Sequence, residues 1–230
     1  MDIDFYYVDS HYIDFLKNYE HTHRGFTCVP NTQYSLHQKF VFGAVLQMHG
    51  MNYFVPVSSQ IKMSVNNIVI RIPSKKKLVS VASLRFSYMI PVPNRCLVKI
   101  NINNDIDDYS RKQLMRAELA FCRRNIHKIT QQAEKTYNAL ITSSKQKVLK
   151  NACDFKLLER AYAEYIGAMP RYYETTKQGV ELLQKSGIEF EARSSPKKDN
   201  IFIIKIQMKD RQAAERILGN TIQHNNNLKK

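Results

Sequence analysis

The feature that most constrains the fold is a change in hydrophobic period near residue 105. Between residues 39 and 102, apolar and β-branched residues form short runs, most of them alternating, with Gly or Pro between them. Such runs are typical of antiparallel strands joined by turns. From residue 108 to 143 there is no Gly or Pro, and apolar residues recur at helical spacing, as they do again at 154–166. This order predicts an α+β fold with an antiparallel sheet followed by helices.

The apolar runs define the expected elements. Six strands are predicted, at residues 3–8, 39–48, 52–57, 68–72, 81–90 and 96–102. The second and third of these form a hairpin around His49-Gly50. A helix of about ten residues, capped by Ser10, is expected after the first strand, and a polar loop at 20–37 follows it. The long helical stretch is expected to break near Asn125.

A second, smaller unit is expected after residue 168. Its pattern predicts an α-β-β-α order, with helices at 174–185 and 211–218 and two alternating strands between them. The expected division is therefore a main domain at 1–168, a small extension at 169–222 and a disordered tail at 223–230. A unit this small is expected to pack on the main body or on another chain.

The positive charge is concentrated in the predicted sheet. Residues 21–104 contain ten Lys or Arg and no Asp or Glu, in a chain whose formal net charge is +15. A folded surface without carboxylates suits a polyanion, so nucleic acid is the leading partner. A basic surface kept only for solubility is the alternative. The chain has neither an apolar run of membrane length nor a signal-peptide pattern, so we expect a cytoplasmic protein with no membrane partner.

The cysteines and histidines do not indicate a metal site. The four cysteines are far apart and contain no CxxC pair, so we expect reduced thiols. His21, His23, Cys28 and His37 lie close in sequence, but their spacing matches no zinc motif. Glycine-rich phosphate loops and HExxH are also missing. We therefore expect neither a metal nor a cofactor.

Polar side chains flank the open end of the predicted hairpin. Because a hairpin brings the outer ends of its strands together, Lys39 is expected near Ser58 and Ser59, with Tyr34 before them and Lys62 after them. RNA cleavage without metal needs a general base, a general acid and cations that stabilise the phosphorane. A lysine can act as base if neighbouring cations lower its pKa. The alternative is an ordinary hairpin end whose hydroxyls cap turns.

These residues also resemble a known family, ToxN/AbiQ, the endoribonuclease toxins of type III toxin–antitoxin systems. The resemblance is carried by Lys39-Phe-Val-Phe-Gly43, by Gly50-Met-Asn-Tyr53-Phe-Val-Pro56-Val-Ser58-Ser59, by Lys62, and by parts of 84–92, 109–125 and 153–159. It covers about residues 4–166.

The resemblance implies a strongly twisted antiparallel sheet, similar to that of the MazF/Kid toxins, surrounded by helices. It implies an enzyme of phage defence by abortive infection. This enzyme would cleave mRNA without metal at adenine-rich sites and leave a 2′,3′-cyclic phosphate. The implied inhibitor is a repeat-derived RNA pseudoknot antitoxin that assembles with the toxin into a closed ring. The implied catalytic residues are Ser59, Lys39, Ser58, Tyr34 and Lys62.

Further basic residues are expected to contact RNA. They are His37, Arg71, Lys75, Lys76, Lys77, Arg85, Lys197 and Lys198. The alternative hypothesis is a non-catalytic RNA- or DNA-binding protein, which explains the charge equally well.

Overall fold

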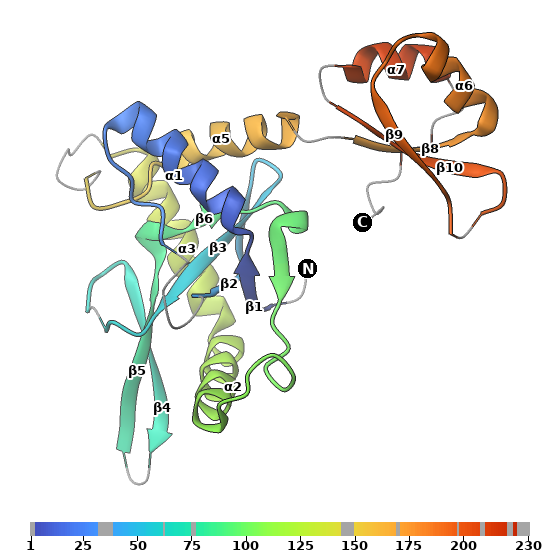
Figure 1. The fold of residues 1–230 in the computed structure, drawn as a ribbon. Coiled ribbons are helices and arrows are strands. Elements are labelled where there is room, and N and C mark those ends of the chain that lie inside the picture. The colour runs from blue at the N-terminus through green and yellow to red at the C-terminus, as the bar shows by residue number, and fades with distance from the viewer. Residues whose placement is uncertain are drawn as a thin grey trace. The chain divides into compact units, whose positions relative to one another are not determined.

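The computed structural model describes residues 3–31, 39–61, 63–74, 77–143, 150–168, 171–196, 198–207, 210–219 and 223–224. The chain forms two compact units, Met1–Ala163 and Glu164–Lys230. The boundary falls inside helix α5 (Phe155–Ala168), and each unit has its own antiparallel sheet (Figure 1).

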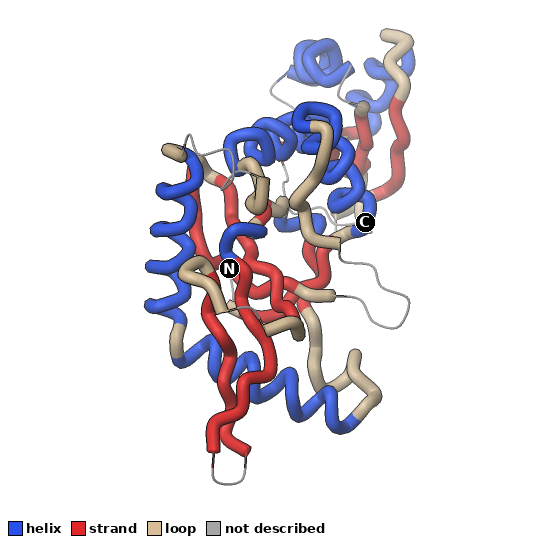
Figure 2. The backbone as a smooth tube through the Cα atoms, turned by 90° about the vertical axis from the view of Figure 1, so that its left-hand side faces the viewer, coloured by secondary structure: helices blue, strands red, loops and turns tan. Residues whose placement is uncertain are grey.

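The first unit is built on a seven-stranded sheet in the order β4-β5-β3-β2-β1-β7, with β6 paired to β3. The strands are β1 (Asp4–Val8), β2 (Val41–Met48), β3 (Met51–Ser58), β4 (Asn67–Ser74), β5 (Lys77–Arg85), β6 (Ile90–Pro91) and β7 (Leu97–Lys99). The predicted hairpin is confirmed as β2–β3. Its turn is made by His49 and Gly50, both at positive φ as a tight hairpin turn requires. The β4–β5 hairpin extends beyond the rest of this sheet (Figure 2).

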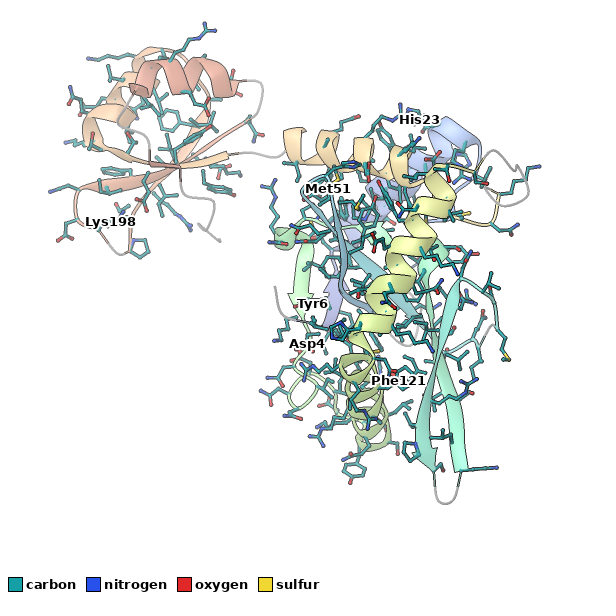
Figure 3. All side chains as sticks on the ribbon, turned by 180° about the vertical axis from the view of Figure 1, so that it is seen from behind. Asp4, Tyr6, His23, Met51, Phe121 and Lys198 are labelled. Carbon is teal, nitrogen blue, oxygen red and sulfur yellow. The ribbon has the colours of Figure 1, made fainter. Side chains whose placement is uncertain are left out.

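Helices cover both faces of this sheet. Helix α1 (Ser10–Arg24) lies on one face, and α3 (Ile126–Ile141) lies on the opposite face (Figures 1 and 3). Helix α2 (Tyr109–Arg124) packs near β4. The predicted break is confirmed, since Asn125 separates α2 from α3. Asp108 caps α2 by accepting a hydrogen bond from the Arg111 backbone N–H at 2.6 Å.

Two predicted elements of this unit are wrong in extent. Helix α1 is longer than expected, because it continues into the predicted loop until Gly25 ends it in the left-handed conformation. Its cap is Asp9 rather than Ser10. The polar last turn resembles a loop in sequence, yet Glu20 on that turn is fully buried. The predicted strand at 81–90 is interrupted by a 3-10 turn at Phe86–Tyr88.

A single carboxylate joins the hairpin to two helices. Glu159 on α5 accepts hydrogen bonds from the Tyr53 hydroxyl at 2.9 Å and from the Tyr137 hydroxyl at 2.6 Å. His49 Nδ1 lies 3.2 Å from its other oxygen. Because β3, α3 and α5 meet at this carboxylate, the β2–β3 hairpin is held firmly at its turn end.

The second unit has the order β-α-β-β-α-β. Its elements are β8 (Arg171–Thr176), α6 (Lys177–Lys185), β9 (Phe190–Ser194), β10 (Ile201–Ile206), α7 (Arg211–Leu218) and β11 (Gln223–His224). The sheet order β11-β8-β10-β9, all antiparallel, is that of a ferredoxin-like unit. Its core is formed by six buried residues, Tyr173, Leu183, Ile204, Ile206, Ala214 and Leu218.

The predicted α-β-β-α order of this unit is therefore incomplete. Residues 174–176 belong to β8, and α6 begins at Lys177. The strand was missed because β8 reads Arg-Tyr-Tyr-Glu-Thr-Thr, with only a weak apolar alternation. Gln223 and His224, within the predicted tail, pair with β8 as a two-residue strand that is too short to give a pattern.

No described helix combines the length and apolar content of a transmembrane segment. All four cysteines are free thiols. Burial raises the pKa of the Cys122 and Cys153 thiols, so both stay protonated at neutral pH. Within the described ranges, no three His, Cys, Asp or Glu side chains are grouped as metal ligands would be.

Candidate active site

The two serines end strand β3. Ser58 is its last residue and is buried, whereas Ser59 follows it and is exposed. The exposed hydroxyl of Ser59 is thus accessible to a ligand at the point where the chain leaves the sheet.

Lys39 lies across the hairpin from Ser58. The β2–β3 register pairs Val41 with Pro56, and the Val57 backbone N–H donates to the Phe40 carbonyl at 3.2 Å. The same antiparallel register, continued by one residue, brings Lys39 opposite Ser58, where paired side chains share one face of the sheet. Lys39 is half-buried. The register thus concerns the backbone of Lys39, and the approach of its ammonium group to the two serines stays a prediction.

Strand β5 supplies a third serine to the same place. Ser83 pairs with Ser58 in the β3–β5 register and is fully buried. Its hydroxyl donates to the Gln60 carbonyl at 3.0 Å, and Ser58 Oγ accepts from the Gln60 backbone N–H at 3.3 Å. Two hydroxyls from neighbouring strands therefore hold the backbone of Gln60, and this clamp fixes the direction of the chain just after Ser59.

Arg85 brings a guanidinium group to this end of the sheet. It ends β5, and its Nη2 donates to Gln60 Oε1 at 3.5 Å. Its Cζ lies 5.9 Å from the centre of the Tyr88 ring. In the described part of the chain its Nε is buried and makes no hydrogen bond. Burial raises the pKa of the Tyr88 phenol, so this neighbour is neutral at pH 7.

The other predicted basic residues belong to other elements or fall outside the described ranges. Arg71 and Lys77 are exposed on the β4–β5 hairpin. Lys77 is six residues before Ser83, or about 20 Å along the strand. Lys198 belongs to the second unit and is paired with Glu174 at 2.6 Å. Six predicted site residues fall outside the described residues, namely Tyr34, His37, Lys62, Lys75, Lys76 and Lys197.

Three residues of the site were not predicted from the sequence. Gln60 follows Ser59 in the chain, whereas Ser83 and Tyr88 come near the site because β5 pairs with the end of β3. Ser83 and Arg85 occupy the polar positions of an alternating strand. This alternation was the only local indication that both side chains lie on the same face.

The site is electropositive for a reason that is visible in the sequence. Strands β2 to β5 all come from residues 21–104, which contain no Asp or Glu. Strands β2 to β5 therefore contribute Lys39 and Arg85 to this end of the sheet but no carboxylate. A bound phosphodiester would meet two cations and an exposed hydroxyl, and such an arrangement can stabilise the negative charge of a phosphorane.

Comparison with known proteins identifies the first unit. The profile of the family "Toxin ToxN, type III toxin-antitoxin system" matches residues 4–163, which end where this unit ends. The endoribonuclease ToxN of Bacillus thuringiensis subsp. kurstaki is 29% identical over 169 residues, 70% of this chain and 83% of that protein. The endoribonuclease AbiQ of Lactococcus lactis subsp. lactis is 27% identical over 177 residues, 69% of this chain and 87% of AbiQ.

Solved structures show the same fold. A type III toxin that is inhibited by a non-coding RNA pseudoknot superposes with a TM-score of 0.61 at 22% identity, covering 72% of this chain and 99% of that one. The structure of AbiQ, a lactococcal anti-phage endoribonuclease of the type III class, gives 0.60 at 25% identity, with 72% and 99% covered. The matched part accounts for nearly the whole of both toxins, and it leaves more than a quarter of this chain as an addition. The chain belongs to the ToxN family of toxins of type III toxin–antitoxin systems.

Proposed function

We propose that this endoribonuclease toxin cleaves RNA at the end of β3, with Ser58, Ser59 and Lys39 as catalytic residues and Tyr34 and Lys62 beside them. The observation that carries the proposal is the register that brings Lys39 opposite Ser58, next to the exposed Ser59. Family membership supports endoribonuclease activity, because the curated relatives are named endoribonucleases.

The proposed reaction is an internal transesterification that needs no metal. A general base removes the proton of the ribose 2′-OH, and the 2′-oxygen attacks the adjacent phosphorus. The bond to the 5′-oxygen breaks, a general acid protonates that oxygen, and a 2′,3′-cyclic phosphate remains. Lys39 and Arg85 stabilise the charge that develops on the phosphorane. Arg71, Lys75, Lys76, Lys77 and His37 extend the contact with the RNA backbone.

We further propose that adenine-rich mRNA is the substrate and that a repeat-derived RNA pseudoknot is the inhibitor. Such an antitoxin would fill the same basic surface and close a ring with the toxin in the cytoplasm. The proposal draws on the pseudoknot inhibition described for a structural neighbour and on the absence of carboxylates in residues 21–104. We also propose that the sheet is similar to that of the MazF/Kid toxins.

We assign the nuclease to residues 1–168 and regard residues 169–222 as an extension. The extension either adds RNA contacts, for instance through Lys197 and Lys198, or serves a structural role. Coverage of nearly the full length of the solved relatives by the first part of this chain supports the division.

The test is inducible expression in bacteria of the wild type, Ser59→Ala and Lys39→Ala, with Ser80→Ala as a matched control on β5. Wild type and Ser80→Ala are expected to arrest growth, whereas the two site variants are not. Purified wild type is expected to cleave adenine-rich RNA in excess chelator and to leave a cyclic phosphate end. Equal toxicity of all four proteins, or RNA binding without cleavage, would favour the non-catalytic alternative.

A further inference from the structure

Three exposed aliphatic side chains follow the site directly. Ile61, Met63 and Val65 lie in the segment between β3 and β4, with exposed fractions of 44%, 82% and 89%. Single exposed aliphatic residues are ordinary on a protein surface, but three within five residues of chain concentrate apolar surface locally, and these three are here called the patch. Such a patch beside a catalytic centre is typical of a ligand-binding surface.

The segment that carries this patch is anchored at both ends. It starts at the clamp on Gln60 described above. At its other end Gln132 Nε2 donates to the Val65 carbonyl at 3.1 Å, and Asn66 Nδ2 donates to Ser87 Oγ at 3.2 Å. The apolar side chains thus project from a backbone whose two ends are fixed to β5, the 3-10 turn and α3.

We propose that Ile61, Met63 and Val65 contact the bases of the substrate RNA next to the scissile phosphate and set part of the sequence preference. The proposal rests on the proposed function, because it takes Ser59 as the point of cleavage. A phosphodiester at Ser59 brings the neighbouring nucleotides to the segment that begins one residue later. Cations hold the phosphates there, so the exposed aliphatic groups are left to the bases.

The chemistry of single-stranded RNA suits this patch. Unstacked bases expose apolar faces, and side chains such as Ile and Met pack against them or wedge between them. The carboxylate-free region around the patch favours a polyanion over an acidic protein surface. The patch is therefore a specificity element, whose loss affects which RNA is bound more than the rate of the chemical step.

The experiment compares two double variants with the wild type and with Ser59→Ala. Met63→Ser/Val65→Ser removes the most exposed part of the patch. Val98→Ser/Leu182→Ser is the matched control, since these aliphatic residues are 63% and 43% exposed on other elements. Each protein is given a random-sequence RNA pool, and cleavage sites are mapped. KM and kcat are then measured on an oligonucleotide with the preferred site, and thermal unfolding and light scattering accompany them.

The patch variant is expected to raise KM by about tenfold, to change kcat by less than about threefold and to broaden the site preference. The control should behave as the wild type. Unchanged KM and unchanged preference overturn the inference, and so does a shift in oligomeric state, which would assign the patch to a protein contact. If Ser59→Ala cleaves as fast as the wild type, the proposed site is refuted and the inference that rests on it falls with it. If Ser59→Ala is inactive and the patch variant behaves as the wild type, the inference alone is refuted.

Discussion

Ser58 and Ser83 face each other across β3 and β5, and the backbone of Gln60 bonds to both hydroxyls. The pair connects the buried sheet to the exposed Ser59, which lies between Ser58 and Gln60 in the chain. A serine outside the hairpin thus helps to hold the backbone that follows Ser59.

The first prediction concerns Ser83→Ala. Removal of this hydroxyl leaves the Gln60 carbonyl without its partner, so the free energy of unfolding should fall by about 1–2 kcal/mol. The clamp also loosens, and kcat should fall by about tenfold because Ser59 is less well oriented. Chemical denaturation and single-turnover cleavage measure both effects. Ser80→Ala on the same strand is the control, and equal losses in both variants would show that the position of Ser83 is not special.

The second prediction concerns Arg85. Lysine retains the charge but not the planar fork that reaches Gln60 and lies over the Tyr88 ring. Arg85→Lys should therefore lose about tenfold in kcat/KM, and Arg85→Gln about a hundredfold. Arg216→Gln removes an exposed charge from α7 as a control. If Arg85→Lys cleaves as fast as the wild type, the charge alone is sufficient.

The part of the site that follows from local pairing could be predicted from the sequence. His49-Gly50 between two apolar runs indicates a hairpin, and a hairpin alone brings Lys39 near Ser58. The clamp could not be predicted, because β5 is the direct neighbour of β3 in the sheet although β4 lies between them in the sequence. Such pairing depends on the packing of the whole sheet, and the hydrophobic periodicity of a single strand does not show which strand it pairs with.

The missed elements of the second unit have another cause. Strand β8 was taken in part for a helix start because, among its described side chains, Tyr173 alone belongs to the apolar core. Strand β11 has two residues, fewer than any periodic pattern needs. The end of α1 was missed because its final residues are polar. The buried residue near this end is Glu20, whose carboxylate accepts hydrogen bonds from five neighbouring groups.

The third prediction is a pH dependence of stability. Glu118 on α2 is 5% exposed, and burial raises its pKa from 4.5 to about 7. Below pH 4.5 this side chain is protonated in both the folded and the unfolded chain. As the pH rises towards 7 the unfolded chain ionises first, so the free energy of unfolding falls, by about 3 kcal/mol in total.

The measurement is the melting temperature of wild type and Glu118→Gln between pH 4.5 and 8. The two proteins should be similar at the acid end, and the variant should become progressively more stable as the pH approaches 7. The exposed Glu134→Gln on α3 serves as the control. A constant difference between Glu118→Gln and wild type at every pH would show that Glu118 ionises normally in the fold.

The last prediction tests whether the second unit can be destabilised without any effect on RNA cleavage by the first unit. A Cβ added to Gly179 would lie 2.0 Å from Thr175 Oγ1 and 3.1 Å from Leu218 Cδ2, so the start of α6 must move away from β8 and α7. Gly179→Ala should therefore destabilise the second unit by about 1–3 kcal/mol. Gly167→Ala is the matched control in α5, where an added Cβ meets no atom within 4 Å and should stabilise the helix by about 1 kcal/mol.

Cleavage should be unchanged in both glycine variants, because the family profile ends at residue 163, before either position. Denaturant unfolding and cleavage of the same preparations test the two statements separately. Unaltered stability of Gly179→Ala would contradict the close approach of α6 to Thr175. A stability loss accompanied by an equal loss of cleavage would show that the second unit takes part in holding the RNA, and this outcome would make it more than a structural addition.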